Sequence, residues 1–291
     1  ICTIGNQQYF QAILGYISGG LTSEKFSHHN KYEFAVKISS SNYGYDENKK
    51  LVDFDKPSNH SWRPFQLAFM LLSIPSLAEP AHIDRTNRLA AHADLLWFPT
   101  GGGKTEAYLA LTALTIAERR TSGHKNVKGV SVIMRYTLRL LTAQQFERAS
   151  FLICALDYLR LELLNRSKLG YSLGDADMPI TLGMWIGSAQ TPNKFAGLKG
   201  GKFKKFFENL TNGIANASNP FPISYCPWCG CRLVSKNNPR NKGYNKDSDK
   251  VQCINPHCFF NKQIPVGFVD EGIYQNPPTL LFATVDKFAQ L

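Results

Sequence analysis

The stretch DLLWFPTGGGKTEAYLALTALTIAERR, residues 94–120, sets the expectation for the fold of this chain. Residues 95–98 form a short apolar run, which is typical of a strand that is covered on both faces. The three glycines at 101–103 let the backbone turn tightly, because they carry no Cβ. After them, apolar residues recur at helical spacing. The stretch therefore predicts a buried strand, a tight turn and an amphipathic helix, in that order.

The turn before this helix has the chemistry of a phosphate-binding loop. Backbone N–H groups at a helix N-terminus favour anions, a lysine can reach the β- and γ-phosphates, and a following hydroxyl can ligate Mg²⁺. The general pattern needs a glycine where Phe98 stands, so this loop is a variant. We expect ATP and Mg²⁺ to bind at Thr100, Gly101, Gly102, Gly103, Lys104, Thr105 and Glu106, with Lys104 and Thr105 in catalytic roles. The alternative is a glycine-rich turn with a surface lysine.

A cluster of cysteines indicates a metal site. Of the seven cysteines, five lie between Cys226 and Cys258, and the chain shows no secretion signal that would favour disulfides. Two close pairs of thiolates suit tetrahedral Zn²⁺ in a closed, structural site. The expected ligands are Cys226, Cys229, Cys253 and Cys258, with Cys231 and His257 as spare candidates. Unbound thiols are the alternative.

The overall charge favours a polyanionic partner. The formal net charge is +11 and the isoelectric point is about 9.3, as in many proteins that bind nucleic acid, although many basic proteins bind none. Because no apolar run is long enough to span a membrane, we expect no membrane partner and a cytoplasmic location. The chain begins with Ile1, and we expect it to start inside a longer protein.

Small and polar residues follow two more predicted strands. Strands are expected over 129–134 and 179–186, followed by Thr137 and Arg139 after the first and by Gly187 after the second. Hydroxyl and guanidinium groups at strand ends suit contacts with a phosphate backbone, and such turns face the ligand edge of a parallel sheet. We expect DNA contacts there. A helix cap, a solvated arginine and an ordinary turn are the alternatives.

Residues 194–205, KFAGLKGGKFKK, carry five lysines and no acid, with Phe195 and Phe203 between them. Such a segment can track a phosphate backbone, and a solvated loop is the alternative. The residues alone leave both open.

The order of the motifs resembles that of superfamily 2 helicases. Residues 99–105 are similar to their Walker A motif, residues 63–66 resemble their adenine-reading motif, and residues 283–288 resemble a motif that contacts the nucleic-acid backbone. The resemblance implies that Gln66 reads adenine and that Thr284 and Lys287 contact DNA. More narrowly, WRPFQLAF, DLLWFPTGGGKTEAYL, YTLRLLTAQQFERA and ATVDKFAQL resemble the helicase subunit of the DISARM anti-phage system. That family implies a partner subunit and action on phage DNA.

The resemblance also implies the fold and the domain organisation. We expect an α/β protein: a RecA-like parallel sheet with helices on both faces, plus an inserted zinc ribbon with four cysteine ligands. Residues 1–60 are expected to form an N-terminal appendage and linker, and residues 61–291 the first RecA-like ATPase domain, incomplete at its C-terminal end. An insertion at about 194–276 is expected to contain the zinc ribbon at 224–264.

The acidic motif of superfamily 2 is expected outside this chain. Asp270 and Glu271 are predicted to lie in a loop, and the Mg²⁺-binding acids beyond Leu291. The chain alone should therefore bind ATP weakly and hydrolyse it hardly at all, because phosphoryl transfer needs charge stabilisation on both sides of the γ-phosphate. Two functions stay open: an ATP-dependent DNA translocase or helicase, and a nucleotide-gated DNA-binding or sensor module.

Overall fold

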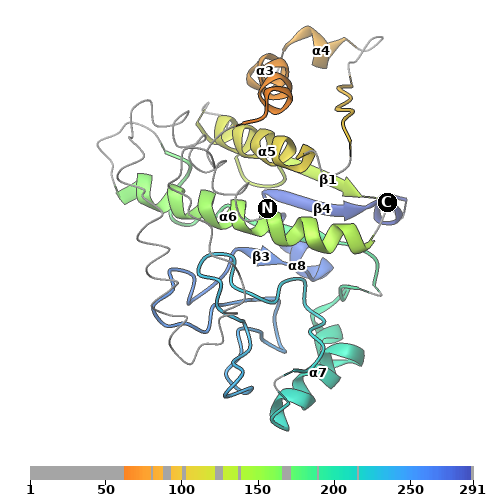
Figure 1. Cartoon of the computed structure of the whole chain (residues 1–291), viewed down its shortest axis with the longest axis vertical. Coiled ribbons are helices and arrows are strands. Elements are labelled where there is room, and N and C mark those ends of the chain that lie inside the picture. The colour runs from red at the N-terminus through yellow and green to blue at the C-terminus, as the bar shows by residue number, and fades with distance from the viewer. Residues whose placement is uncertain are drawn as a thin grey trace.

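The computed structural model describes residues 62–79, 81–87, 93–99, 103–121, 127–136, 139–165, 172–188, 190–214 and 216–289. A parallel sheet lies at the centre (Figure 1). Its strands are β1 (Val132–Tyr136), β2 (Leu182–Trp185), β3 (Val266–Gly267) and β4 (Leu280–Thr284), in the order β1-β4-β2-β3. All three pairings are parallel. The predicted α/β class is confirmed.

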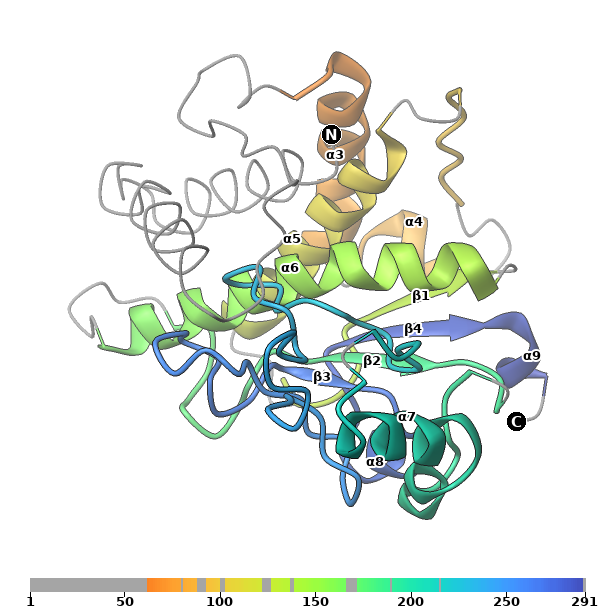
Figure 2. The same cartoon turned by 60° about the horizontal axis from the view of Figure 1, so that its bottom comes forward.

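Helices cover both faces of the sheet, as predicted. They are α3 (Pro64–Ala78), α4 (Ile83–Thr86), α5 (Lys104–Thr121), α6 (Arg139–Asn165), the 3-10 helix η4 (Phe195–Lys199), α7 (Gly201–Thr211), α8 (Asp270–Gln275) and α9 (Val285–Phe288). Figure 2 shows α6 above the strands and α8 below them. Alternation along β4 explains this arrangement: Leu280 and Phe282 join the core formed with α5 and α6, whereas Leu281 and Ala283 pack with Ile273 of α8.

The direction of α5 follows from the two arginines in its last turn. Arg119 Nη1 donates to the carbonyl of Val130, just before β1, at 2.7 Å. Arg120 donates to the carbonyl oxygens of Leu173 and Met178, each at 2.8 Å, near the start of β2. Because the C-terminus of α5 lies at the amino ends of the strands, its N-terminus points toward their carboxyl ends. This orientation brings Lys104 to the edge where parallel sheets bind ligands.

The zinc-ribbon region runs directly into the sheet. Short antiparallel bridges, such as Tyr225 with Arg232 and Val251 with Ile264, hold this part of the chain together. Ile264 precedes β3, which pairs with β2. The aromatic ring of Trp228 lies 4.6 Å from that of Tyr158 on α6. The ribbon therefore packs against the same helix that covers the sheet.

One prediction about the N-terminal part of the sheet is wrong. Residues 95–98 were expected to form a buried strand, yet Leu95 and Trp97 are each 86% exposed. Within the described residues the sheet has four strands, and residues 95–98 belong to none of them. A buried strand needs neighbouring strands to pair with its backbone, but the described strands pair only with one another and not with residues 95–98. Before this segment, helix α3 runs through Pro75 to Ala78, because the residues after a proline can still donate to earlier carbonyls.

One helix replaces a predicted loop, and a second lies where a loop was one of two alternatives. Asp270 and Glu271 were expected to lie in a loop, and they instead form the first turn of α8. The basic segment 194–205 lies in η4 and α7. In α7, Phe203, Phe206 and Leu210 are buried along one side, so the solvated-loop alternative is wrong. These buried side chains hold α7 in place, so its lysines have fixed positions on the protein surface.

Candidate nucleotide site and metal centre

Helix α3 is joined to the phosphate-loop region through Gln66. Its Nε2 donates to the carbonyl oxygen of Gly103 at 2.8 Å, although the two residues are far apart in the sequence. Its Oε1 accepts from the backbone N–H of Arg63 at 2.9 Å. The side chain is 5% exposed. An amide of this kind has one further N–H and one further lone pair, so contact with an adenine edge remains chemically open to Gln66.

Lys104 opens α5 and folds back over the loop. Its Nζ donates to the carbonyl oxygen of Phe98, and to that of Pro99 at 3.2 Å. The ring of Phe98 stacks on Phe65 of α3, with 3.9 Å between centroids. The ammonium is therefore held beside the helix N-terminus, where the dipole also favours anions. A phosphate oxygen would offer Lys104 a stronger acceptor than either carbonyl.

The first turn of α5 is also tied to α6. Glu106 forms an ion pair with Arg148 of α6. Burial raises the pKa of the Glu106 carboxyl. Thr105, the expected Mg²⁺ ligand, is partly buried in the same turn. Arg148 was not anticipated from the sequence, because the ion pair depends on how α5 and α6 pack.

The structure does not describe the whole loop. Thr100, Gly101 and Gly102 lie outside the described residues, so their predicted contacts with ATP stay predictions. Gly103, Lys104, Thr105 and Glu106 are described and lie together at the start of α5.

The predicted DNA contacts fall at one edge of the sheet. In the register of the strands, Tyr136 at the end of β1 is opposite Thr284 at the end of β4. Trp185 at the end of β2 is opposite Ala283. Gly187 follows β2, and its carbonyl oxygen accepts from the N–H of Gln190 at 2.8 Å in a turn. The carboxyl ends of these three strands therefore lie side by side.

One residue of that group is not described, and another is described only in its backbone. Thr137 lies outside the described residues. Arg139 is the first residue of α6, with its backbone at the same edge of the sheet. Their predicted contacts with DNA stay predictions.

Thr284 and Lys287 are buried, at 2% and 5% exposure. Nζ of Lys287 lies 2.5 Å from Oδ2 of Asp270 at the start of α8, and 3.4 Å from Oδ1 of Asn193. Burial raises the pKa of the Asp270 carboxyl, and the Lys287 ammonium opposes that shift. Lys287 therefore joins α9, α8 and the loop after β2 in this structure, and a contact with DNA would require this ion pair to open.

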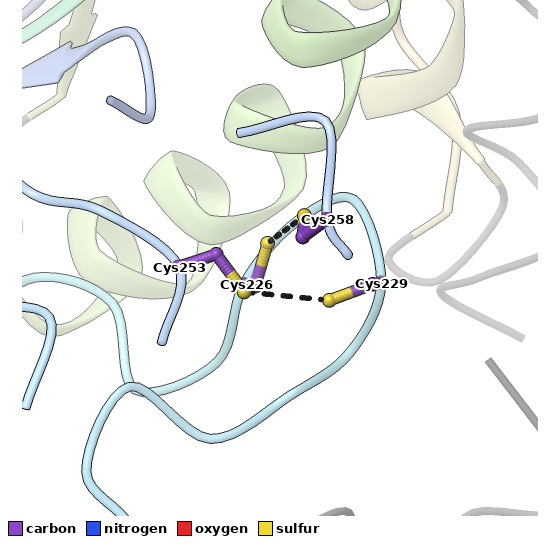
Figure 3. Close-up of side chains that lie close together, drawn as sticks. All are labelled: Cys226, Cys229, Cys253 and Cys258. Atoms are coloured by element: carbon purple, nitrogen blue, oxygen red, sulfur yellow. Dashed lines mark hydrogen bonds between the residues drawn. The ribbon is translucent and has the colours of Figure 1, made fainter. Parts of the chain in front are cut away.

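The four cysteines that the sequence predicts as metal ligands lie close together (Figure 3). The Sγ atoms of Cys226, Cys229, Cys253 and Cys258 all lie within 4.8 Å of one another. Cys226 and Cys258 are 3.7 Å apart, and Cys229 and Cys253 are 3.5 Å apart. A tetrahedral Zn²⁺ with bonds of about 2.3 Å would hold its sulfurs about 3.8 Å apart. The geometry fits a structural zinc ion.

The surroundings of the cluster support this ligand set. Burial raises the pKa of the Cys226 thiol, so its thiolate form would need a cation beside it. Nδ2 of Asn255 lies 3.9 Å from Sγ of Cys229, where it can support a thiolate. Cys231 is buried but points its Sγ toward the carbonyl oxygen of Arg232, and His257 is exposed. Neither spare candidate belongs to the group of four.

In the part of the chain that the structure describes, no helix is both long enough and apolar enough to cross a membrane.

No protein-family model matches the chain. The chain is 37% identical over 258 residues to DISARM protein DrmA of Bacillus paralicheniformis. The alignment covers 85% of this chain and 22% of DrmA, so the chain spans about a fifth of the length of that protein. The predicted resemblance is therefore confirmed: the chain is similar to DrmA over most of its residues.

Proposed function

We propose that this chain is part of an ATP-dependent DNA translocase or helicase subunit of a prokaryotic anti-phage defence system. The hydrogen bond from Gln66 to Gly103 carries the proposal, because it joins the candidate adenine-reading helix to the phosphate loop. The similarity to DISARM protein DrmA supports the defence role. A partner subunit of the defence complex and DNA are the proposed partners.

ATP would bind at the start of α5. Lys104 would exchange the carbonyl oxygens of Phe98 and Pro99 for oxygens of the β- and γ-phosphates. The Thr105 hydroxyl would hold Mg²⁺, which neutralises charge on the phosphates during transfer. The ion pair of Glu106 with Arg148 would keep the first turn of α5 in position on α6. Hydrolysis would also require acids and arginines outside this chain.

DNA would bind beside the nucleotide, at the carboxyl edge of the sheet. The ends of β1, β4 and β2 supply the proposed backbone contacts at Thr137, Arg139, Gly187, Thr284 and Lys287. Opening of the Lys287–Asp270 ion pair would release one of these cations. A ligand at this edge can therefore shift the loop after β2 relative to α8. Zn²⁺ would hold the ribbon as a structural ion.

Substitution of Lys104 tests the nucleotide site. In the full-length protein, we expect Lys104→Ala to abolish DNA-stimulated ATP hydrolysis, because the phosphates lose their cation, and to leave DNA affinity within about a few-fold. Lys128→Ala is the matched control, since Lys128 is exposed at the opposite edge of the sheet and should not affect turnover. The measurements are phosphate release and binding of a labelled oligonucleotide.

Each outcome has a distinct meaning. ATP hydrolysis that persists in Lys104→Ala would rule out this phosphate site. Wild-type protein that binds DNA in response to ATP, without turnover, would instead support the nucleotide-gated sensor.

A further inference from the structure

A cavity of about 470 Å³ lies between the end of β2 and helix α7. Phe206 and Phe221 line it and are themselves buried, with ring centroids 5.5 Å apart. Met184 of β2 adds to this apolar floor. Lys202 and Lys205 stand at the rim, one turn apart on α7. Apolar floors with a few polar groups at the mouth are typical of small-ligand sites.

The charged side chains that line this cavity are all positive. Its described lining contains the two lysines and several amides and hydroxyls, and it contains no carboxylate. Nζ of Lys202 donates to the carbonyl oxygen of Gln190 at 2.8 Å, which holds the ammonium at the rim. Burial lowers the pKa of Lys202, and an anion beside it would favour the charged form. The cavity is therefore suited to an anionic ligand with an apolar, flat body.

A second hollow, of about 600 Å³, adjoins the first and shares Lys202. Ser188, Asn193 and Lys194 also line it, and its described lining again contains no carboxylate. Ser188 follows Gly187 at the carboxyl edge of the sheet, and Asn193 contacts Lys287. The two hollows thus form a basic track that leads from the proposed DNA edge to α7.

We propose that this track binds single-stranded DNA, with one base in the cavity against Phe206 and Phe221 and the adjacent phosphates at Lys202 and Lys205. The proposal rests on the proposed DNA-binding function and adds a contact on α7. Only an unpaired base can enter a cavity of this kind, because the bases of a duplex stay stacked inside it. Contacts of lysine with phosphate and of aromatic rings with bases are the usual pair in single-strand binding.

Salt dependence tests the phosphate contacts in the full-length protein. Binding of fluorescent oligothymidylate is measured by anisotropy over a range of salt concentrations. Each phosphate contact of a single strand contributes about 0.7 to the slope of log affinity against log salt, so Lys202→Gln with Lys205→Gln should reduce it by about 1.4. The matched control, Lys236→Gln with Lys262→Gln, removes the same charge from exposed sites on the ribbon and should leave the slope unchanged.

A second variant tests the cavity itself. Ser218 is exposed and lines its mouth, so Ser218→Trp should block entry of a base without altering charge. We expect weaker binding of the single strand at an unchanged slope, and unchanged binding of a duplex of the same length.

Three results would overturn this inference: an unchanged slope in the double variant, an equal loss in the matched control, or full single-strand affinity in Ser218→Trp. If those results come from a protein that still binds DNA and hydrolyses ATP, only the α7 site is wrong. A wild-type protein with no DNA affinity at any salt concentration would overturn the proposed function as well.

Discussion

Gly103 is the residue at which the phosphate loop meets α3. Its φ is +93°, a region that other residues rarely adopt. A Cβ there would lie 2.8 Å from Nε2 of Gln66 and 3.4 Å from Oε2 of Glu106. Gly103→Ala should therefore lower the free energy of unfolding by about 1–2 kcal/mol through the backbone, and should also displace Gln66 and weaken ATP binding. Thermal unfolding and a titration with fluorescent ATP measure the two effects.

Gly129→Ala is a control that separates the backbone strain at positive φ from the clash with Gln66. Gly129 has the same φ, +93°, and a Cβ added to it would meet no described atom within 4 Å, so it shares the strain without the clash. Both variants should lose stability, and only Gly103→Ala should lose ATP affinity. Equal ATP affinity in the two would mean that Gln66 has no part in nucleotide binding.

At the scale of elements, Arg120 fixes the C-terminal end of α5. Its guanidinium donates to the carbonyl oxygens of Leu173, Met178 and Pro179, and burial lowers its pKa to about 10, so it stays charged at neutral pH. Arg120→Met should lower the free energy of unfolding by about 3 kcal/mol, because buried carbonyls lose their donor. Arg119→Met, which removes a bond to one carbonyl, should cost about 1 kcal/mol. Urea unfolding measures both, and equal losses would contradict this role.

Elements with a strong local pattern could be predicted from the sequence. The helix from Lys104 follows from its apolar spacing and the preceding glycines, and it is found as α5. Helix α7 was missed because its lysines dominated the interpretation, although the spacing of Phe203, Phe206 and Leu210 was a usable signal. At residues 95–98 the sequence instead predicted a strand that the structure does not form. The local composition suits a buried strand, but burial depends on strands elsewhere in the chain.

In the candidate site, too, some features could be predicted from the sequence and others could not. The clustering of the four cysteines was predictable because their spacing in the sequence is typical of zinc ligands. The pairings of Glu106 with Arg148 and of Asp270 with Lys287 were not, because each joins residues that only the packing of helices brings together. Lys287 in particular was expected to contact DNA, and its buried ion pair with Asp270 on α8 could not be read from the sequence.

At the scale of the whole molecule, the ribbon shares one hydrophobic core with the sheet. Cys226, Val251 and Ile264 of the ribbon belong to the same cluster as Leu152 of α6 and Leu182 of β2. The ribbon also continues into β3, the neighbour of β2. Loss of the proposed zinc ion should therefore weaken the sheet as well as the ribbon, because small zinc-binding units depend on their metal for folding.

Cys226→Ser in the full-length protein tests this coupling. We expect less than one zinc per chain, a lower unfolding temperature, and faster hydrogen exchange in β2 and α6 as well as in the ribbon. Cys231→Ser makes the same change at a buried cysteine outside the group of four, and should keep its zinc. Loss of zinc in Cys231→Ser alone would mean that the ligand set is wrong. Loss of zinc in Cys226→Ser with unchanged exchange in β2 would mean that the ribbon folds independently, since a shared core transmits its loss of packing to the strand beneath it.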